Sequence, residues 1–402
     1  MNKVLVIGAG ASGLTAAIMA SRYGSVVTVL EKNKQNGKKI IVSGSGRCNY
    51  FNDDFNIKHY HSENINILSN IINEENKNKV LDFMKSIGVV ERIENGYYYP
   101  YSNQSISVLS ALEREAKKLN VNIVNNSFVT SIKYDNNLFV VTTDDETYTA
   151  NKLILATGSN AYYKDLVNTY ELAKSLDLNI IDVKPALVQL IVNNSITKKW
   201  AGVRCKVKLD LYEDNIFIKQ EKGEVTLTDY GISGICALNL SGIIKRGLSK
   251  HKYNIKINFV PNIASNPEDM IKYLDNYSKI INDRLVIELL DNLINYKLGN
   301  ILVSNLVNKK YNDLKKHEKE LIATNLTSFN VLINDTKEFN DAQVSSGGVD
   351  LEEIDIKTFE SHKIKNLYII GELLDVYGDC GGYNLGFAWL SGIIAGSSVN
   401  ND

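Results

Sequence analysis

The pattern of apolar positions at the start of the chain predicts a strand, a tight turn and a helix in immediate succession. Residues 3–7 (Lys-Val-Leu-Val-Ile) form a short apolar run that ends at a glycine, which is typical of a buried parallel strand. Residues 14–21 have helical character, and residues 25–30 form a second, β-branched strand that stops at Glu31. This order predicts one strand–helix–strand unit of a parallel sheet.

Later segments continue the same sheet and add an antiparallel one. Residues 152–158 (Lys-Leu-Ile-Leu-Ala-Thr-Gly) predict a strand that returns to the parallel sheet, and residues 366–370 predict another. Alternating apolar and polar residues predict a three-stranded meander over residues 127–134, 138–143 and 146–149.

The pattern between about residues 186 and 336 predicts an insertion of a different kind. Residues 266–326 are helical in pattern, with Leu285, Leu289 and Leu293 spaced four apart. Strands are predicted at 187–192, 203–212, 216–219, 223–227 and 328–332.

Composition excludes several functional classes. The 402 residues include 45 Lys and Arg against 46 Asp and Glu, a net charge of −1, which excludes nucleic-acid binding by bulk charge alone. No C-x-x-C pair occurs among the four cysteines, which are Cys48, Cys205, Cys236 and Cys380. Their spacing does not match that of metal ligands. We therefore expect reduced thiols, no metal site and a cytoplasmic protein.

Two uncharged stretches, residues 4–21 and 380–401, approach the length of a membrane span. Both are dense in glycine, which weakens an isolated helix and indicates close approach of the backbone to a neighbour. We interpret them as buried helices around a ligand, and expect neither a signal peptide nor contact with a membrane.

The turn after the first strand carries the chemistry of nucleotide binding. Gly8, Gly10 and Gly13 form a G-x-G-x-x-G sequence between a strand and a helix. In this context the glycines allow a tight turn and close approach of a pyrophosphate to the helix N-terminus. Glu31, 18 residues after Gly13, is placed to bind an adenosine ribose and disfavours the 2′-phosphate of NADP.

The chain resembles FAD domains of the glutathione-reductase type. The resemblance rests on the G-x-G-x-x-G turn, the three-stranded meander, the Ala-Thr-Gly sequence, and the last strand and helix. Several segments are more specifically similar to the BaiN-like (aminoacetone-oxidase-like) flavoprotein family. They are residues 37–49 (GKKIIVSGSGRCN), 99–100 (YP), 228–234 (TDYGISG), 347–349 (GGV), 371–375 (GELLD) and 381–385 (GGYNL). Departures are Ser45 within the usual Gly-Gly-Gly, Cys380 before the Gly-Gly pair and residues 159–164 after Ala-Thr-Gly.

The resemblance implies an α/β fold with a split Rossmann-type FAD-binding domain, made of a parallel sheet plus a three-stranded meander. An inserted β-rich domain then carries a helical subdomain. The expected boundaries are residues 1–185 plus 337–402 for the FAD domain, 186–262 plus 327–336 for the β-rich domain and 263–326 for the helices.

FAD is expected to bind non-covalently, since no histidine or cysteine lies in an evident flavinylation motif. Arg47, beside a Gly-Ser-Gly segment, is a candidate for a pyrophosphate or flavin contact. Glu372 occupies the position of an acid that binds the ribityl chain or the bridging phosphate, and the start of the last helix is expected to face the flavin. The full set of candidate cofactor-binding residues is Gly8, Gly10, Ala11, Ser12, Gly13, Glu31, Lys32, Lys38, Arg47, Val129, Thr157, Gly158, Gly371, Glu372, Gly382, Asn384 and Leu385.

Catalytic residues are not identified by the sequence. Tyr383, Asp375 and Tyr230 are candidates for proton transfer, although a structural role suits each better. Cys48 and Cys380 are better interpreted as inert thiols than as a redox pair. Trp200 and the tyrosines of the insertion either line a substrate pocket or form core.

The favoured function is reduction of an activated C=C bond, or a similar small organic substrate, by NAD(P)H through the flavin. The insertion has no second G-x-G-x-x-G, so NAD(P)H would dock transiently. The alternatives are an oxidase that passes electrons from a small amine or aminoketone to O2, a tRNA-modifying flavoprotein and a flavin-binding protein without turnover. A small-molecule substrate is expected and no nucleic-acid partner. Oligomeric state and substrate identity do not follow from the sequence.

Overall fold

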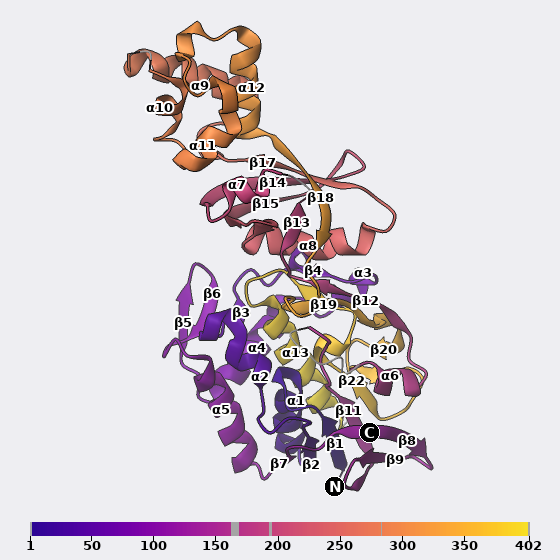
Figure 1. Ribbon diagram of the computed structural model, residues 1–402. Coiled ribbons are helices and arrows are strands. Elements are labelled where there is room, and N and C mark those ends of the chain that lie inside the picture. Colours follow the sequence, from indigo (N-terminus) through magenta and orange to yellow (C-terminus); the bar gives the residue numbers. More distant parts are fainter. Residues whose placement is uncertain (1, 162–168, 193–194, 283, 401–402) are drawn as a thin grey trace. The chain divides into compact units, whose positions relative to one another are not determined.

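The computed structural model describes residues 2–161, 169–192, 195–282 and 284–400. It divides into two compact units (Figure 1): unit 1 comprises Met1–Val183 and Val344–Asp402, and unit 2 comprises Lys184–Gln343. Each unit has its own hydrophobic core. Within the described ranges, no helix is long and apolar enough to cross a membrane.

Unit 1 is built on a seven-stranded sheet in the order β20-β21-β22-β11-β1-β2-β7. The strands from β22 to β7 run parallel, while β20 and β21 form an antiparallel edge. The bounds are β1 Lys3–Ile7, β2 Val26–Leu30, β7 Asn122–Val124, β11 Lys152–Leu155, β20 Ile354–Asp355, β21 Glu360–Ser361 and β22 Leu367–Ile369. The sheet confirms the predicted Rossmann-type fold class.

Helices α1 (Ala11–Arg22) and α13 (Tyr383–Ser398) lie side by side in unit 1 (Figure 1). A Cβ at Gly392 would lie 2.6 Å from the carbonyl oxygen of Ser12, and one at Gly396 would collide with the carbonyl oxygen of Ala16. The glycines of the last helix were expected to surround a ligand. For these two the neighbour is helix α1, so packing requires them.

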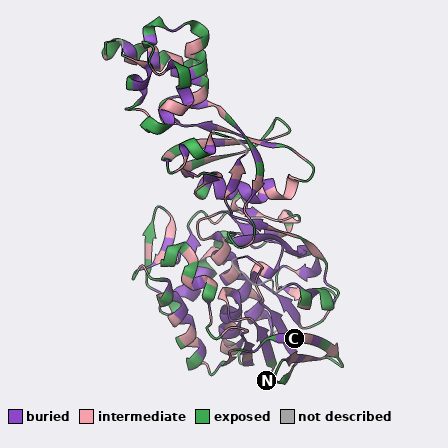
Figure 2. Cartoon of the chain, in the orientation of Figure 1, coloured by how far each residue is buried: buried purple, intermediate pink, exposed green. Residues whose placement is uncertain are grey.

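Smaller elements complete unit 1, and buried residues are concentrated in its central strands (Figure 2). The predicted meander is present as β8 Val129–Asp135, β9 Leu138–Thr143 and β10 Thr147–Ala150. The other strands are β3 Phe51–Asn52, β4 Tyr60–His61, β5 Glu91–Glu94, β6 Tyr97–Pro100, β19 Val344–Val349 and β23 Tyr377–Gly378. Strand β12 (Ile180–Ala186) pairs with β19, and its last three residues belong to unit 2. The other helices are α2 Lys38–Val42, α3 Ile65–Leu68, α4 Glu74–Ser86, α5 Ser105–Lys118 and α6 Glu171–Ser175.

Unit 2 contains a closed barrel in the order β13-β16-β15-β14-β17-β18. Its strands are β13 Leu190–Val192, β14 Arg204–Glu213, β15 Ile216–Leu227, β16 Gly231–Ser233, β17 Tyr253–Asn258 and β18 Phe329–Thr336. Its helices are α7 Thr197–Trp200, α8 Ile235–Gly247, α9 Pro267–Ile280, α10 Val286–Leu290, α11 Tyr296–Val303 and α12 Lys316–Thr327. Barrel and helices share one hydrophobic core.

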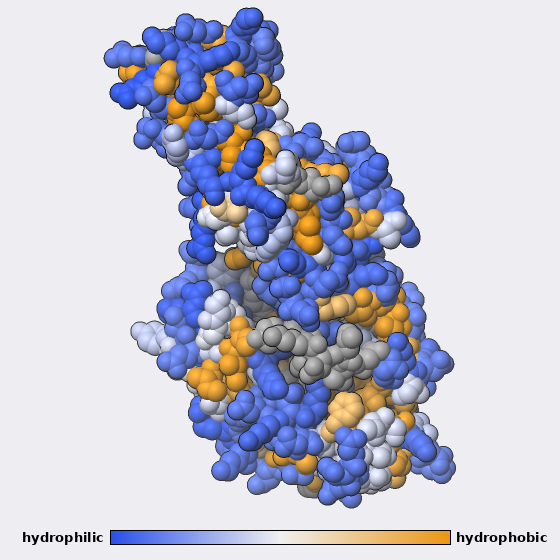
Figure 3. Space-filling model, viewed as in Figure 1, coloured by the Kyte–Doolittle hydropathy of each residue, from blue (hydrophilic) through white to orange (hydrophobic). Residues whose placement is uncertain are grey.

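The surface of each unit is mainly hydrophilic in the face shown in Figure 3, with separate apolar patches. The most exposed apolar side chains of unit 2 include Ile216 and Phe217, which follow the β14–β15 turn. The strands of the barrel bury one face, as in β14, where Val207, Leu209 and Leu211 are buried and alternate with less buried residues.

Two element predictions in unit 2 were wrong. Residues 216–219 and 223–227 form one strand, β15, which pairs with β14 along its whole length. Gly223 does not interrupt it, because it pairs with Val207 within the continuous ladder. The helix marked by Leu285, Leu289 and Leu293 also ends early: α10 stops at Leu290, and the N–H of Leu293 closes a turn on the carbonyl of Leu290.

Candidate functional site

The turn between β1 and α1 uses its three glycines in two different ways. A Cβ at Gly8 or Gly13 would collide with backbone carbonyl oxygens, of Ala156 and Gly8 respectively, and Gly8 has a φ of 106°. A Cβ at Gly10 would meet nothing within 4 Å. Gly10 is also the N-cap of α1, beside the helix N–H groups of Ala11, Ser12 and Gly13 that have no partner within the helix. The turn therefore leaves open the space in which an anion would meet these donors.

Glu31 follows β2 and binds the same turn. Its side chain is buried, and its Oε2 accepts the N–H of Ala9 at 2.8 Å. Its Oε1 accepts both the N–H and the side-chain amide of Asn33, at 2.8 and 2.6 Å. Burial lowers the pKa of the neighbouring Lys32, with Glu31 opposing and Lys39 and Lys38 adding to the effect. Lys38 donates to Asn33 Oδ1 at 2.6 Å.

Glu372 takes part in a polar cluster that joins three distant segments. Its Oε2 pairs with Lys39 Nζ at 2.8 Å, and its Oε1 accepts the hydroxyl of the buried Ser159 at 2.8 Å. Lys39 Nζ also donates to Ser159 Oγ at 3.2 Å. The sequence identified Glu372, whereas Ser159 was not singled out. Its neighbours Tyr162, Tyr163 and Lys164 lie outside the described residues.

The start of α13 is held rigidly. Gly382 is its N-cap with a φ of 95°, and a Cβ there would lie 2.6 Å from the carbonyl oxygen of Phe51. The Asn384 amide accepts the N–H of Gly378 at 2.8 Å and donates to its carbonyl at 2.9 Å. Leu385 is half-buried in the first turn. The helix N-terminus thus has a fixed position from which its N–H groups and dipole can act.

The remaining candidates are spread around unit 1. Val129 is buried at the start of the meander, and the Thr157 hydroxyl donates to the carbonyl of Thr169 at 3.2 Å. Gly158 faces open space, whereas a Cβ at Gly371 would collide with Ser12. Arg47 is exposed, with its guanidinium 5.4 Å from the centre of the Tyr99 ring.

The side chains considered for proton or redox chemistry are buried or make contacts that stabilise the fold. Asp375 is buried and accepts the N–H groups of Glu63 and Gly347 at 2.8 and 2.9 Å. All four cysteines are free, and burial raises the pKa of Cys48 to about 11. In unit 2, Trp200 is fully buried and donates to the carbonyl of Thr228 at 3.0 Å, so it belongs to the core. Tyr230 lies under Lys337, 4.4 Å from ring centre to Nζ.

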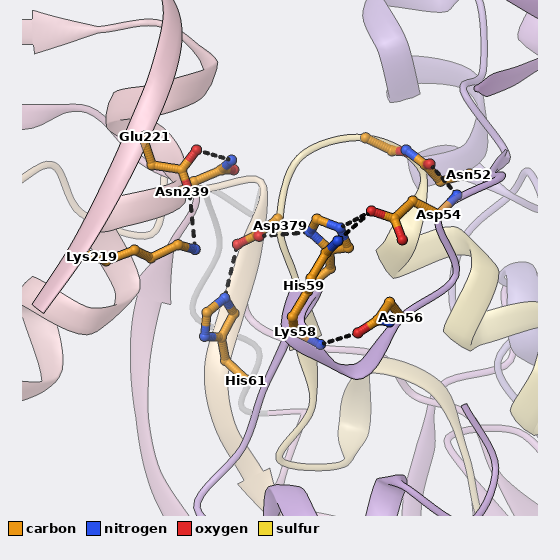
Figure 4. Close-up of polar contacts among 12 residues, drawn as sticks. Asn52, Asp54, Asn56, Lys58, His59, His61, Lys219, Glu221, Asn239 and Asp379 are labelled. Atoms are coloured by element: carbon orange, nitrogen blue, oxygen red, sulfur yellow. Dashed lines mark hydrogen bonds and ion pairs between the residues drawn. The ribbon is translucent and has the colours of Figure 1, made fainter. Parts of the chain in front are cut away.

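Sequence reasoning missed a polar cluster around Asp379 (Figure 4). His59 Nδ1 and His61 Nε2 both lie within hydrogen-bond distance of the Asp379 carboxylate, at 3.3 and 2.8 Å. A signal was present, because the two histidines are separated by one residue and the chain has only five. Which carboxylate they meet depends on the antiparallel pairing of β4 with β23, which no local pattern reveals.

Comparison with known proteins identifies the family. Residues 2–398 match the model of the HI0933-like protein Rossmann domain. The chain belongs to this family. The resemblance to a flavoprotein family that the motifs indicated is confirmed.

Two curated relatives of the HI0933-like chain match it along nearly their whole length. The 3-dehydro-bile acid delta(4,6)-reductase of Clostridium scindens is 34% identical over 416 residues, with 99% of each chain covered. The ribosomal RNA dihydrouridine synthase of Escherichia coli is 26% identical over 401 residues, covering 96% of this chain and 95% of the relative. Family and relatives identify the HI0933-like protein as an enzyme of the FAD-dependent oxidoreductase class.

Solved structures support the fold. The 3-ketosteroid-delta4-(5alpha)-dehydrogenase of Rhodococcus jostii RHA1, solved in complex with 4-androstene-3,17-dione, superposes with a TM-score of 0.50 at 13% identity, covering 100% of this chain and 97% of that one. Because the sequence identity is 13%, this similarity shows only that the HI0933-like chain and the dehydrogenase share a fold.

Proposed function

We propose that the protein binds FAD non-covalently in unit 1 and reduces a C=C bond conjugated to a carbonyl group in a small organic substrate. The observation that carries the proposal is the 34% identity, over 99% of both chains, to a named delta(4,6)-reductase. The relative named a dihydrouridine synthase also adds two hydrogens to its substrate, uridine. Both names therefore describe enzymes that add hydrogen to an unsaturated ring.

The residues of unit 1 fit a dinucleotide. A Cβ at Gly10 would meet no atom within 4 Å, so space is open at the N-terminus of α1. At Gly8 and Gly13 the corresponding space is occupied by backbone carbonyl groups. That difference suits a pyrophosphate held by the first N–H groups of α1. Glu31 already fixes the turn through Ala9 and would meet the ribose with its remaining acceptor capacity.

The chemistry that FAD supplies when bound is the acceptance and delivery of a hydride at its N5 atom. The N-terminus of α13, fixed by Gly382 and Asn384, would present partial positive charge to the ring edge on which negative charge develops. Glu372 would bind the ribityl hydroxyl groups, and Lys39 keeps its carboxylate paired in the half-buried cluster. Arg47, exposed above Tyr99, is free to approach a phosphate or the flavin.

NAD(P)H is the proposed source of electrons. The sequence contains a single G-x-G-x-x-G unit in the context of a strand and a helix, which supports transient docking of the nicotinamide rather than a second nucleotide domain.

The direct test is anaerobic mixing of the purified protein with NADH and, separately, with NADPH, while the visible flavin band is followed. Rapid bleaching by one of them, and recovery of the band on addition of a 4-ene-3-ketosteroid, are the expected results. A band that persists with both nucleotides would contradict the nicotinamide step. Amines or aminoketones that bleach it, with peroxide formed in air, would favour the oxidase alternative.

RNA reduction is the second candidate, and the charge distribution supports testing it. Unit 2 carries 23 Lys and Arg against 18 Asp and Glu, whereas unit 1 carries 22 against 28. A local basic excess is what RNA binding requires. Reduced protein mixed anaerobically with ribosomal RNA would then form dihydrouridine, measured by mass spectrometry of the nucleosides. Absence of dihydrouridine, with ready reduction of enones, would exclude this candidate.

A further inference from the structure

The Asp379 cluster is built from segments that meet at the start of α13. Strand β4 pairs with β23 antiparallel, with His61 opposite Tyr377. Asp379 comes directly after β23 and is 4% exposed, and its N–H donates to the carbonyl of His59 at 2.8 Å. Figure 4 shows both imidazoles directed at this one carboxylate.

The two imidazoles differ in their surroundings. His59 lies between two carboxylates, with Nδ1 3.3 Å from Asp379 Oδ2 and Nε2 3.0 Å from Asp54 Oδ2. A carboxylate accepts hydrogen bonds, so this geometry favours a proton on both ring nitrogens. Burial opposes the charged form, but the hydrogen bonds to Asp379 and Asp54 outweigh it and raise the pKa of His59. Below its raised pKa, His59 is therefore a positively charged partner of Asp379.

His61 presents only one nitrogen to the carboxylate. Its Nε2 lies 2.8 Å from Asp379 Oδ1, which assigns the Nε2 hydrogen to this bond. Nδ1 is then the ring nitrogen that the Asp379 carboxylate does not contact. The ring is also stacked on Tyr377, with centroids 4.7 Å apart. A carboxylate that fixes the tautomer and orientation of an imidazole is the arrangement used in acid–base catalysis.

The cluster is fixed to the part of α13 that would face the flavin. The ring of His59 is stacked on that of Tyr383, the first residue of the helix, with centroids 4.4 Å apart. The Tyr60 hydroxyl donates to the carbonyl of Tyr383 at 3.2 Å. Asn384 binds both backbone groups of Gly378. Strands β4 and β23 and the first turn of α13 therefore position the imidazoles together.

We propose that His61, oriented by Asp379, is the catalytic acid that protonates the substrate during reduction of its double bond. This inference rests on the proposed function. The alkene gains a hydride, which originates from the nicotinamide, at one carbon and a proton at its neighbour. The Nδ1–H bond of His61 breaks as the new C–H bond forms, and NAD(P)+ and neutral His61 are left. Solvent then restores the proton, and His59 serves as a positioning residue through Asp379.

Other nearby groups suit this role less well. The Asp375 carboxylate accepts the backbone N–H groups of Glu63 and Gly347, so its two oxygens are engaged in joining segments of unit 1. Burial, with Asp54, Tyr97 and Asp379 adding to it, raises the pKa of Tyr383 above its ordinary value. A hydroxyl group with a raised pKa is a weaker proton donor than an imidazolium.

The test separates proton transfer from reduction of the flavin. Flavin reduced by dithionite is mixed anaerobically with a 4-ene-3-ketosteroid, and its reoxidation is followed in wild type, His61→Gln and Asp379→Asn. Loss of a general acid should slow reoxidation at least about 100-fold in His61→Gln and remove the pH dependence attributable to His61. Reduction by NAD(P)H should stay within about threefold of wild type, because that step needs no substrate proton.

His362→Gln is the matched control, since it makes the same substitution at an exposed imidazole in unit 1. It should leave reoxidation unchanged. If His61→Gln does not fold, His61→Phe provides the same test, because it keeps an aromatic ring against Tyr377 and has no ring nitrogen. NMR titration of the five histidines gives a readout that needs no turnover. The ring nitrogen shifts should show that the Nε2-protonated tautomer of His61 is less favoured in Asp379→Asn, where the carboxylate acceptor is absent.

The outcomes distinguish the two proposals. A wild-type protein that neither takes electrons from NAD(P)H nor passes them to any enone contradicts the proposed function itself. A wild-type protein that does both, with a His61→Gln variant that reoxidises at the same rate and with the same pH profile, overturns the role of His61 alone.

Discussion

Glycines of one motif have different physical roles in this protein. Gly8 and Gly13 are required by the protein's own backbone, since a Cβ at either would collide with a carbonyl oxygen. Gly10 is not required in this way, because a Cβ there would meet open space. Its backbone is extended, with φ −82° and ψ −167°, which an alanine can adopt. At Gly10 the protein's own atoms leave room for a side chain, and this open space is where we propose that the pyrophosphate binds.

Substitution of Gly10 by alanine should therefore weaken FAD binding with little loss of stability. The methyl group would occupy the space proposed for the pyrophosphate, and we expect FAD affinity to fall at least about tenfold, or 1.4 kcal/mol. The apoprotein should lose less than about 1 kcal/mol, from the weaker N-cap. Flavin fluorescence titration and urea unfolding of the apoprotein measure the two effects.

Gly13→Ala provides the contrast. Its methyl group would collide with the carbonyl of Gly8, so the free energy of unfolding should fall by about 1–3 kcal/mol or more. A Gly10→Ala protein that binds FAD as tightly as wild type would show that the pyrophosphate does not occupy this space.

Cys48 should be inert to alkylation in the folded protein. Its side chain is fully buried, and burial raises its pKa to about 11, so about one thousandth of it is thiolate at pH 8. We expect iodoacetamide to leave the Cys48 peptide unmodified in native protein and to label it fully in urea, as measured by mass spectrometry. Labelling of native Cys48 at the rate of an exposed thiol would contradict this account and reopen a redox role.

Residue-level prediction succeeded where a short motif has its own geometry. The turn from Gly8 to Gly13 places α1 as the sequence indicated, because strand, turn and helix are adjacent in the chain. The Asp379 cluster could not be predicted in the same way. His61 and Asp379 are 318 residues apart in sequence, and only the pairing of two short strands brings them together.

Among the elements, the packing of α1 against α13 depends on glycine. Gly396→Ala should destabilise unit 1 by about 1–3 kcal/mol, because its methyl group would collide with the carbonyl of Ala16. Ser397→Ala is a suitable control on the same helix, since it only removes a hydroxyl that bonds the carbonyl of Ile393. Chemical unfolding of both variants measures the difference. Equal stability of Gly396→Ala and wild type would show that the two helices can separate without cost.

Helices and strands were predicted best where their residues are buried. Strands β1 and β11 are buried along almost their whole length, so their apolar runs were visible in the sequence. The helices of unit 2 were less well predicted, because spacing does not record where a helix stops. Leu293 continues the spacing of Leu285 and Leu289 but lies beyond the end of α10, in a turn. Its side chain packs on the unit 2 core without a helix.

One of the two units of the molecule has sequence motifs that indicate its function, and the other unit does not. The nucleotide fingerprint, the Glu372 cluster and the Asp379 cluster all lie in unit 1. Unit 2 has its own core and a barrel, but its Trp200 is packed in that core. Substrate choice therefore could not be predicted from recognisable residues.

The central claim is that electrons leave the bound FAD to a conjugated C=C bond, and single-turnover stoichiometry tests it most directly. Protein reduced with one equivalent of NAD(P)H is mixed without oxygen with a 4-ene-3-ketosteroid, and the saturated product is counted by mass spectrometry. We predict one molecule of product for each flavin, with full return of the oxidised spectrum. A protein that takes up no FAD, or a reduced flavin that persists with every enone and reoxidises only in air, would contradict the account.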